Sequence, residues 1–147
     1  VLIQPRRRWG QPVAHVYSSF FMSQLCGGQT QNNRYNFEAV RNYDNHIEGG
    51  LTTIGELYMP INVGNSHWNF IRVKMATKSV ELYDSSGEKE DNMRFMDASK
   101  RYIFHALFKN AEEERPSYDD WGQEWTTRDH SGNCPHQEKF FDCECSR

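Results

Sequence analysis

At 147 residues the chain is long enough for one domain with its own core, whereas two domains of half that length would each be marginal. Its formal net charge of −3 lacks the basic excess typical of nucleic-acid binding, and no apolar run approaches the length of a membrane span. We therefore expect an N-terminal arm at residues 1–12 and one domain at residues 13–147, with no nucleic-acid or membrane contact. Four cysteines are too few for a disulfide scaffold, which favours a reducing, intracellular compartment.

The predicted elements begin with residues 13–21, where β-branched and aromatic residues indicate a strand or the buried start of a helix. Asn36 can cap a helix whose apolar residues recur at spacings of three and four until the Gly-Gly pair at 49–50 ends it. Residues 54–63 then form an apolar segment interrupted by Pro60, a pattern typical of an edge strand or of a strand's end.

Apolar and polar residues alternate at 70–75 and, after a turn, at 79–82, which predicts two further strands in a hairpin. From residue 91 to about 110 the apolar period becomes helical. The chain is then polar and rich in turns, with Trp121 and Trp125 as expected anchors. The fold class predicted from these elements is α+β, with a central, mostly antiparallel sheet and flanking helices.

Four polar residues occur in an order that suits cysteine-dependent acyl transfer: His67, Asp84, Gln137 and Cys143. This chemistry needs a nucleophile, a base, a group that orients the base and a donor to the oxyanion. The hairpin puts His67 just before its first strand and Asp84 at the end of its second, so both lie at the same open end. A contact between them would hold one ring nitrogen and leave the other to take a proton from a thiol. Each residue alone would suggest only packing or a turn, so the hypothesis depends on their joint order.

Three blocks around these residues resemble the signatures of the SUMO-specific and related ubiquitin-like-protein proteases. They are Ser66-His67-Trp68, Leu82-Tyr83-Asp84-Ser85, and Gln137 six positions before Cys143. The resemblance extends to residues 59–63 and 16–21 and covers most of the chain from about Val13 to Cys143. It implies a papain-like, adenain-like cysteine protease domain at 13–147, incomplete and truncated at both ends.

The resemblance also implies a role for each residue. Cys143 would be the nucleophile, His67 the general base and acid, and Asp84 the group that orients His67. Gln137 would donate to the oxyanion, and Trp68 would bind substrate by lying over the Gly-Gly tail of the modifier.

The implied reaction cleaves the peptide or isopeptide bond after the C-terminal Gly of SUMO or a related modifier. It serves protein processing or deconjugation, passes through a thioester on Cys143, and needs no cofactor or metal. The implied partners are SUMO or another ubiquitin-like protein and its conjugates, in the nucleus or cytoplasm.

Several positions depart from the family pattern. Glu144 follows the expected nucleophile where the family has Gly, and its negative side chain opposes both the thiolate and the oxyanion. Lys139 stands where Asn is usual, and the chain stops at Arg147, before the helix that follows the nucleophile in complete members. The Trp-Leu-Asn-Asp type helix expected upstream is also missing. One alternative is therefore an impaired or inactive protease remnant that binds a ubiquitin-like protein without cutting it.

A small zinc-binding module is a less favoured alternative. Five potential ligands fall within sixteen residues: His130, Cys134, His136, Cys143 and Cys145. The common finger spacing is absent, since no two of these cysteines are separated by two residues.

Overall fold

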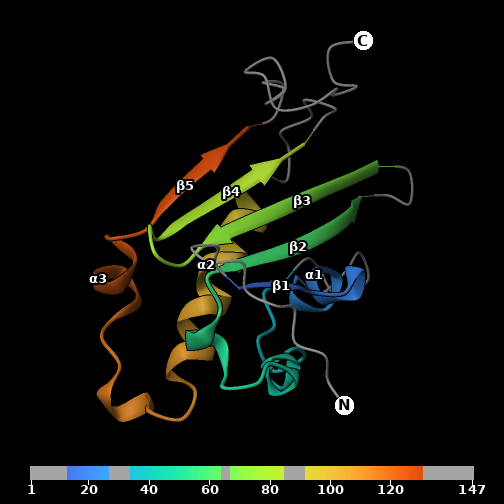
Figure 1. Cartoon of the computed structure of the whole chain (residues 1–147). Coiled ribbons are helices and arrows are strands. Elements are labelled where there is room, and N and C mark those ends of the chain that lie inside the picture. Colours follow the sequence, from blue (N-terminus) through green and yellow to red (C-terminus); the bar gives the residue numbers. More distant parts are fainter. Residues whose placement is uncertain (1–12, 27–33, 64–66, 85–91, 131–147) are drawn as a thin grey trace.

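The computed structural model describes residues 13–26, 34–63, 67–84 and 92–130 (Figure 1). Within these residues, five strands form one sheet in the order β1-β2-β3-β4-β5. The strands are β1 (Ala14–Val16), β2 (Glu56–Val63), β3 (His67–Lys74), β4 (Ser79–Tyr83) and β5 (Thr126–Asp129). The helices are α1 (Ser19–Leu25), α2 (Asn92–Phe108) and α3 (Tyr118–Gly122), and short 3-10 helices lie at Tyr43–His46, Leu51–Thr53 and Glu112–Glu114. The predicted α+β class is confirmed.

The sheet is mixed. The inner pairs, β2 with β3 and β3 with β4, are antiparallel as the alternating pattern predicts. The outer pairs, β1 with β2 and β4 with β5, are parallel. The polar residues of β5 gave no strand signal, because its side chains are largely exposed and no apolar alternation marks it.

Pro60 lies in β2, where sequence reasoning expected an edge strand or a strand's end. In the sheet β2 is flanked on both sides, but β1 pairs only with Glu56, Leu57 and Tyr58. Pro60 pairs with Phe70 on β3, beyond the end of β1. Proline has no backbone N–H to donate, and at Pro60 no residue of β1 lies opposite β2. At this position β2 therefore behaves as an edge strand, which tolerates proline.

One face of the sheet carries the core and packs against α2, which runs across it in Figure 1. The inward side chains of β2, β3 and β4 alternate with outward ones, and the apolar members are at most 3% exposed. They are Leu57, Met59, Ile61, Ile71, Val73, Val80 and Leu82. Each contributes about 1.5–3 kcal/mol by burial. The packing of this face fixes the position of α2 against the strands.

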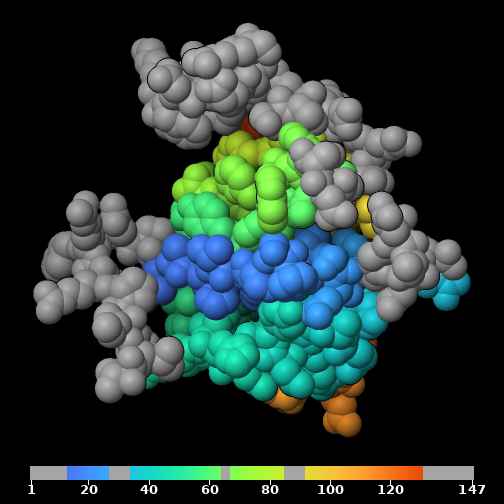
Figure 2. Space-filling model, turned by 90° about the vertical axis from the view of Figure 1, so that its right-hand side faces the viewer, coloured from blue at the N-terminus to red at the C-terminus, as the bar shows by residue number. Residues whose placement is uncertain are grey.

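Helix α1 covers the β1–β2 part of the core. Phe21, Met22 and Leu25 are fully buried, and the Phe21 ring meets the Tyr102 ring of α2 edge-on at 4.7 Å. In Figure 2 the surface of β1 and α1, in blue, lies between residues 34–53, in cyan and teal, and the green strands. The segment at 13–21, expected as a strand or the start of a helix, therefore forms both in succession.

The helix predicted after Asn36 is wrong in type. Asn36 Oδ1 does accept from the Ala39 N–H at 3.3 Å, yet the chain continues as turns and the 3-10 helix Tyr43–His46. Asn and Asp side chains at 42, 44 and 45 compete with helical hydrogen bonding. Gly49 and Gly50 do lie in a turn that needs glycine, with φ of 79° and 81°, but they follow the 3-10 helix and do not end an α-helix.

The predicted helix at 91–110 is confirmed as α2. Met93, in its first turn, is 59% exposed although it is apolar. The expected anchors also hold: Trp125 is 8% exposed, and the Trp121 ring lies 5.1 Å from it and 5.2 Å from Phe104. No helix in the described ranges has the length and apolar character to span a bilayer.

His105 gives the fold a pH-dependent contact. Burial lowers its pKa below the ordinary 6.5, Arg115 and Arg101 lower it further, and Glu112 opposes them. The neutral ring accepts through Nδ1 from the Tyr35 hydroxyl at 2.7 Å. The unfolded chain takes up a proton near pH 6.5, whereas the folded ring resists it. The stability that the neutral His105 ring contributes is therefore complete above pH 6.5, and it is lost as pH falls through the depressed pKa of His105.

We expect the urea midpoint of unfolding to fall between about pH 7.5 and about pH 5.5, and His105→Gln to reduce that fall. The substitution removes the group that must be protonated in the buried setting. Equilibrium unfolding at both pH values checks this. A His105→Gln protein that loses as much stability on acidification as the wild type would contradict the assignment.

Candidate active site

His67 and Asp84 meet at one edge of the sheet. His67 opens β3 and Asp84 directly follows β4, and because these strands are antiparallel, the start of one lies beside the end of the other. His67 Nε2 donates to Asp84 Oδ1 at 2.6 Å. The structure thus brings together the two residues that the hairpin argument placed at the same end.

The two side chains differ in burial. The Asp84 side chain is 2% exposed and that of His67 is 26% exposed. A buried carboxylate needs donors, and the short distance is typical of a charge-assisted hydrogen bond. Because Nε2 is engaged, Nδ1 is the ring nitrogen left for proton exchange with another group.

Asn69 adds a second donor to Asp84 and was missed by sequence reasoning. It is 4% exposed, and with its amide nitrogen turned to the carboxylate it donates to Asp84 Oδ1 and to the Trp68 carbonyl, both at 3.1 Å. The same nitrogen lies 2.6 Å from His67 Nε2. Asn69 therefore lies against both members of the His67–Asp84 pair. The sequence did contain a signal for Asn69, because it lies two residues after His67 and residues two apart on a strand share a face.

A third donor reaches Asp84 from α2. Asn92 Nδ2 lies 3.4 Å from Asp84 Oδ2 and 3.3 Å from Asp129 Oδ2, and Asn92 is 2% exposed. Asp129 ends β5 and pairs in register with Leu82 on β4. No sequence pattern pointed to Asn92 or Asp129, because their approach depends on how α2 and β5 dock.

Trp68 lies next to His67 but on the other face of β3. Its side chain is 58% exposed. Phe70, also on the Trp68 face, is 38% exposed.

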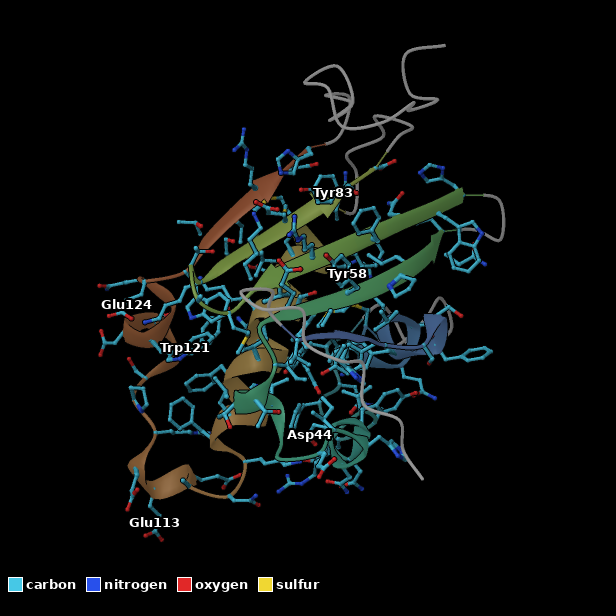
Figure 3. The ribbon with its side chains drawn as sticks, in the orientation of Figure 1. Asp44, Tyr58, Tyr83, Glu113, Trp121 and Glu124 are labelled. Atoms are coloured by element: carbon cyan, nitrogen blue, oxygen red, sulfur yellow. The ribbon has the colours of Figure 1, made fainter. Side chains whose placement is uncertain are left out.

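The face that carries Trp68 also carries a row of rings that runs across β2, β3 and β4 to His130, the residue after β5. Centroid distances are 6.4 Å from Tyr58 to Phe70, 4.8 Å from Phe70 to Tyr83 and 4.5 Å from Tyr83 to His130. Figure 3 shows Tyr58 and Tyr83 on this side of the sheet, away from α2. His130, a potential ligand in the zinc hypothesis, is thus stacked on Tyr83.

The remaining predicted site residues, Gln137 and Cys143, lie outside the described residues, as does Glu144. So do the other zinc candidates, Cys134, His136 and Cys145. Within the part of the chain that the structure describes, no group of three His, Cys, Asp or Glu side chains is placed to hold a metal ion.

A mixed five-stranded sheet, with His67 and Asp84 in contact at the open end of its central hairpin, is thus the framework of the candidate site. The chain belongs to the Ulp1 protease family, and residues 10–144 match that family's C-terminal catalytic domain. It is therefore a cysteine protease domain by family, which confirms the resemblance found in the three sequence blocks. No curated protein sequence matches the chain significantly.

Solved structures show the same fold. The SUMO protease Ulp1 with its catalytic cysteine oxidised to a sulfonic acid aligns with a TM-score of 0.59 and 16% identity, over 79% of this chain and 46% of that one. The Ulp1 protease domain in complex with Smt3, the yeast ortholog of SUMO, gives 0.58 and 16%, over 79% and 47%. A de-sumoylating protease gives 0.57 and 16%, over 83% and 43%. The chain thus spans less than half the length of these proteins.

Proposed function

We propose that this protein is a cysteine peptidase or isopeptidase that cleaves after the C-terminal Gly of SUMO or a related ubiquitin-like modifier. The observation that carries the proposal is the 2.6 Å contact between His67 Nε2 and the buried Asp84 carboxylate. It supports an oriented imidazole whose Nδ1 is available to a thiol. Membership of the Ulp1 protease family supports Cys143 as that thiol.

The proposed reaction begins when the Cys143 thiol gives its proton to His67 Nδ1 and the thiolate attacks the carbonyl carbon of the terminal Gly. Gln137 donates to the oxyanion of the tetrahedral intermediate. The C–N bond then breaks, and the departing amine takes the proton from His67. Water, deprotonated by His67, attacks the thioester and releases the modifier with a free carboxylate and Cys143 as a thiol. Asp84 stays ionised and holds the ring throughout.

Substrate recognition in this proposal depends on Trp68. Its indole, exposed on the other face of β3 one residue after His67, supports a role as a flat wall that accepts Gly-Gly and rejects branched side chains. The partner is SUMO or another ubiquitin-like protein, free as a precursor or joined to a target. Such a substrate places the enzyme in the nucleus or cytoplasm.

A probe with a modifier's Gly-Gly tail and a thiol-reactive terminus tests the proposal. We expect wild type to form a covalent adduct and Cys143→Ala to form none, because only the thiolate reacts. Intact-protein mass spectrometry measures the adduct. Cys145→Ser, which removes a thiol two positions away, is the matched control and should still be labelled. Equal labelling of wild type and Cys143→Ala, or labelling of neither, would sink the catalytic assignment.

A second candidate is a remnant that binds the modifier without cutting it, and the observation that favours it is Glu144 after the expected nucleophile. Its side chain opposes the two negative charges of the mechanism. The same probe separates the candidates when modifier binding is measured in parallel by calorimetry. Binding without labelling of wild type would support the remnant.

A further inference from the structure

We propose that Asn92 is a positioning residue, which fixes the Asp84 carboxylate, and through it His67, by donating to Asp84 and Asp129 together. The inference rests on the proposed function of the His67–Asp84 pair. It adds to that pair Asn92, at the start of α2, and Asp129, at the end of β5. The hydrogen bonds of Asn92 to Asp84 and Asp129 are called the bridge below.

The bridge begins with the two oxygens of Asp84. Oδ1 accepts from His67 Nε2 at 2.6 Å, and Oδ2 lies 3.4 Å from Asn92 Nδ2. With both oxygens engaged from different elements, the carboxylate cannot rotate without losing a donor. Both contacts are in a nearly water-free setting, since Asp84 is 4% and Asn92 2% exposed, so a lost donor is not replaced by solvent.

Asp129 determines which way the Asn92 amide points. The amide nitrogen carries two hydrogens, and Nδ2 lies 3.3 Å from Asp129 Oδ2 as well as 3.4 Å from Asp84 Oδ2. If the amide turned over, its oxygen would face two carboxylates, which offer acceptors alone when ionised. The two acids therefore hold the nitrogen in the donating orientation.

The start of α2 reduces the electrostatic repulsion between Asp84 and Asp129. Two carboxylates that share one amide repel each other, and Asn92 is the first residue of α2. The N-terminal end of a helix carries partial positive charge that stabilises nearby anions. The amide and the start of the helix therefore both offset the repulsion between the two carboxylates.

The bridge should be visible in the tautomer of His67. A fixed Asp84 carboxylate holds the proton on Nε2 and leaves the lone pair on Nδ1. Asn92→Leu keeps a side chain of similar size but removes the donor. Asp84 Oδ2 then loses its contact with Asn92, the carboxylate turns, and the share of the Nδ1–H tautomer rises.

Ser99→Ala is the matched control on the same helix. Ser99 is 0% exposed and makes a buried hydrogen bond of its own, from Oγ to the Phe95 carbonyl at 2.8 Å. A purely structural role for Asn92 predicts that both variants lose stability and that neither changes His67. A positioning role predicts that only Asn92→Leu changes His67.

The experiment records side-chain ¹⁵N spectra of the whole chain at about pH 8, with His67→Gln to assign the signal. We expect mainly Nε2–H for His67 in wild type and Ser99→Ala, and a clear rise of Nδ1–H in Asn92→Leu. We also expect alkylation of Cys143 by iodoacetamide to slow about tenfold in Asn92→Leu, the size of one lost hydrogen bond to a charged group. An unchanged tautomer in folded Asn92→Leu would overturn the proposal.

Asp129→Asn provides a second variant if Asn92→Leu fails to fold. It keeps the shape of the side chain and removes the charge that orients the Asn92 amide, so it should shift the tautomer in the same direction by a smaller amount. A folded Asp129→Asn with the wild-type tautomer would also overturn the proposal. The tautomer measurement needs no reaction at Cys143, so a failure of the proposed function remains distinguishable from a failure of this inference.

Discussion

Asp84→Asn is expected to lower turnover of a modifier-tailed substrate on the order of 10⁴-fold while leaving its binding nearly unchanged. The reason is the set of donors around the carboxylate. Oδ1 accepts from His67 Nε2, and Oδ2 faces Asn92 Nδ2. The NH₂ group that the substitution introduces must therefore oppose one of these donors. If it faces His67, it donates to Nε2 and forces the proton onto Nδ1, the nitrogen that the thiol needs.

Steady-state kinetics with a modifier fused to a C-terminal reporter measures this effect as kcat and KM, and calorimetry with the free modifier measures binding. Asp119→Asn is the matched control, because Asp119 is an exposed aspartate on α3, far along the chain from the pair. We expect the control to keep wild-type turnover. Unchanged turnover in Asp84→Asn would remove Asp84 from the mechanism.

The elements predicted correctly are those with a strong local period. The β3–β4 hairpin alternates apolar and polar residues, and α2 repeats its apolar residues at helical spacing, so each pattern specified its own structure. β5 has no such pattern. It becomes a strand by pairing with the edge of β4 after the chain has passed through α2 and α3, which is a tertiary event.

The segment after Asn36 shows the opposite case, in which tertiary contact overrides a local pattern. Its apolar spacing is helical, but the Asp44 side chain turns inward to Lys109, just beyond α2. The chain follows that contact as turns and a 3-10 helix. Local spacing alone cannot foresee a partner sixty-five positions away.

The site residues also divide into those that a local pattern predicts and those that depend on tertiary packing. His67 and Asp84 were predictable because an antiparallel hairpin brings its two open ends together, and Asn69 was within reach of the same argument through strand alternation. Asn92 and Asp129 were not, since they arrive on α2 and β5. The contact between His67 and Asp84 is confirmed, whereas the roles of His67, Asp84, Cys143, Gln137 and Trp68 stay predictions.

Removal of Asp44 should cause a large loss of stability. Asp44 Oδ1 pairs with Lys109 Nζ at 2.5 Å, and their side chains are only 9% and 13% exposed. Asp44→Ala leaves the ammonium group buried without its counter-charge, and the Arg41 carbonyl, 3.1 Å from Nζ, is a neutral acceptor that cannot replace it. We expect the free energy of unfolding to fall by about 3–5 kcal/mol. Urea denaturation, with ellipticity as the signal, measures this change.

Two further variants separate the effect of the buried charge on stability from the effect of lost packing around residue 44. The double variant Asp44→Leu with Lys109→Met replaces the ion pair by apolar side chains, and it should recover most of the lost stability because no charge remains buried. Glu124→Ala breaks the ion pair with Lys78, which is exposed on both sides, and should leave the unfolding midpoint nearly unchanged. If Asp44→Ala costs no more than Glu124→Ala, the pair with Lys109 does not hold residues 34–50 against the end of α2. A double variant as unstable as Asp44→Ala would instead assign the loss to packing around residue 44.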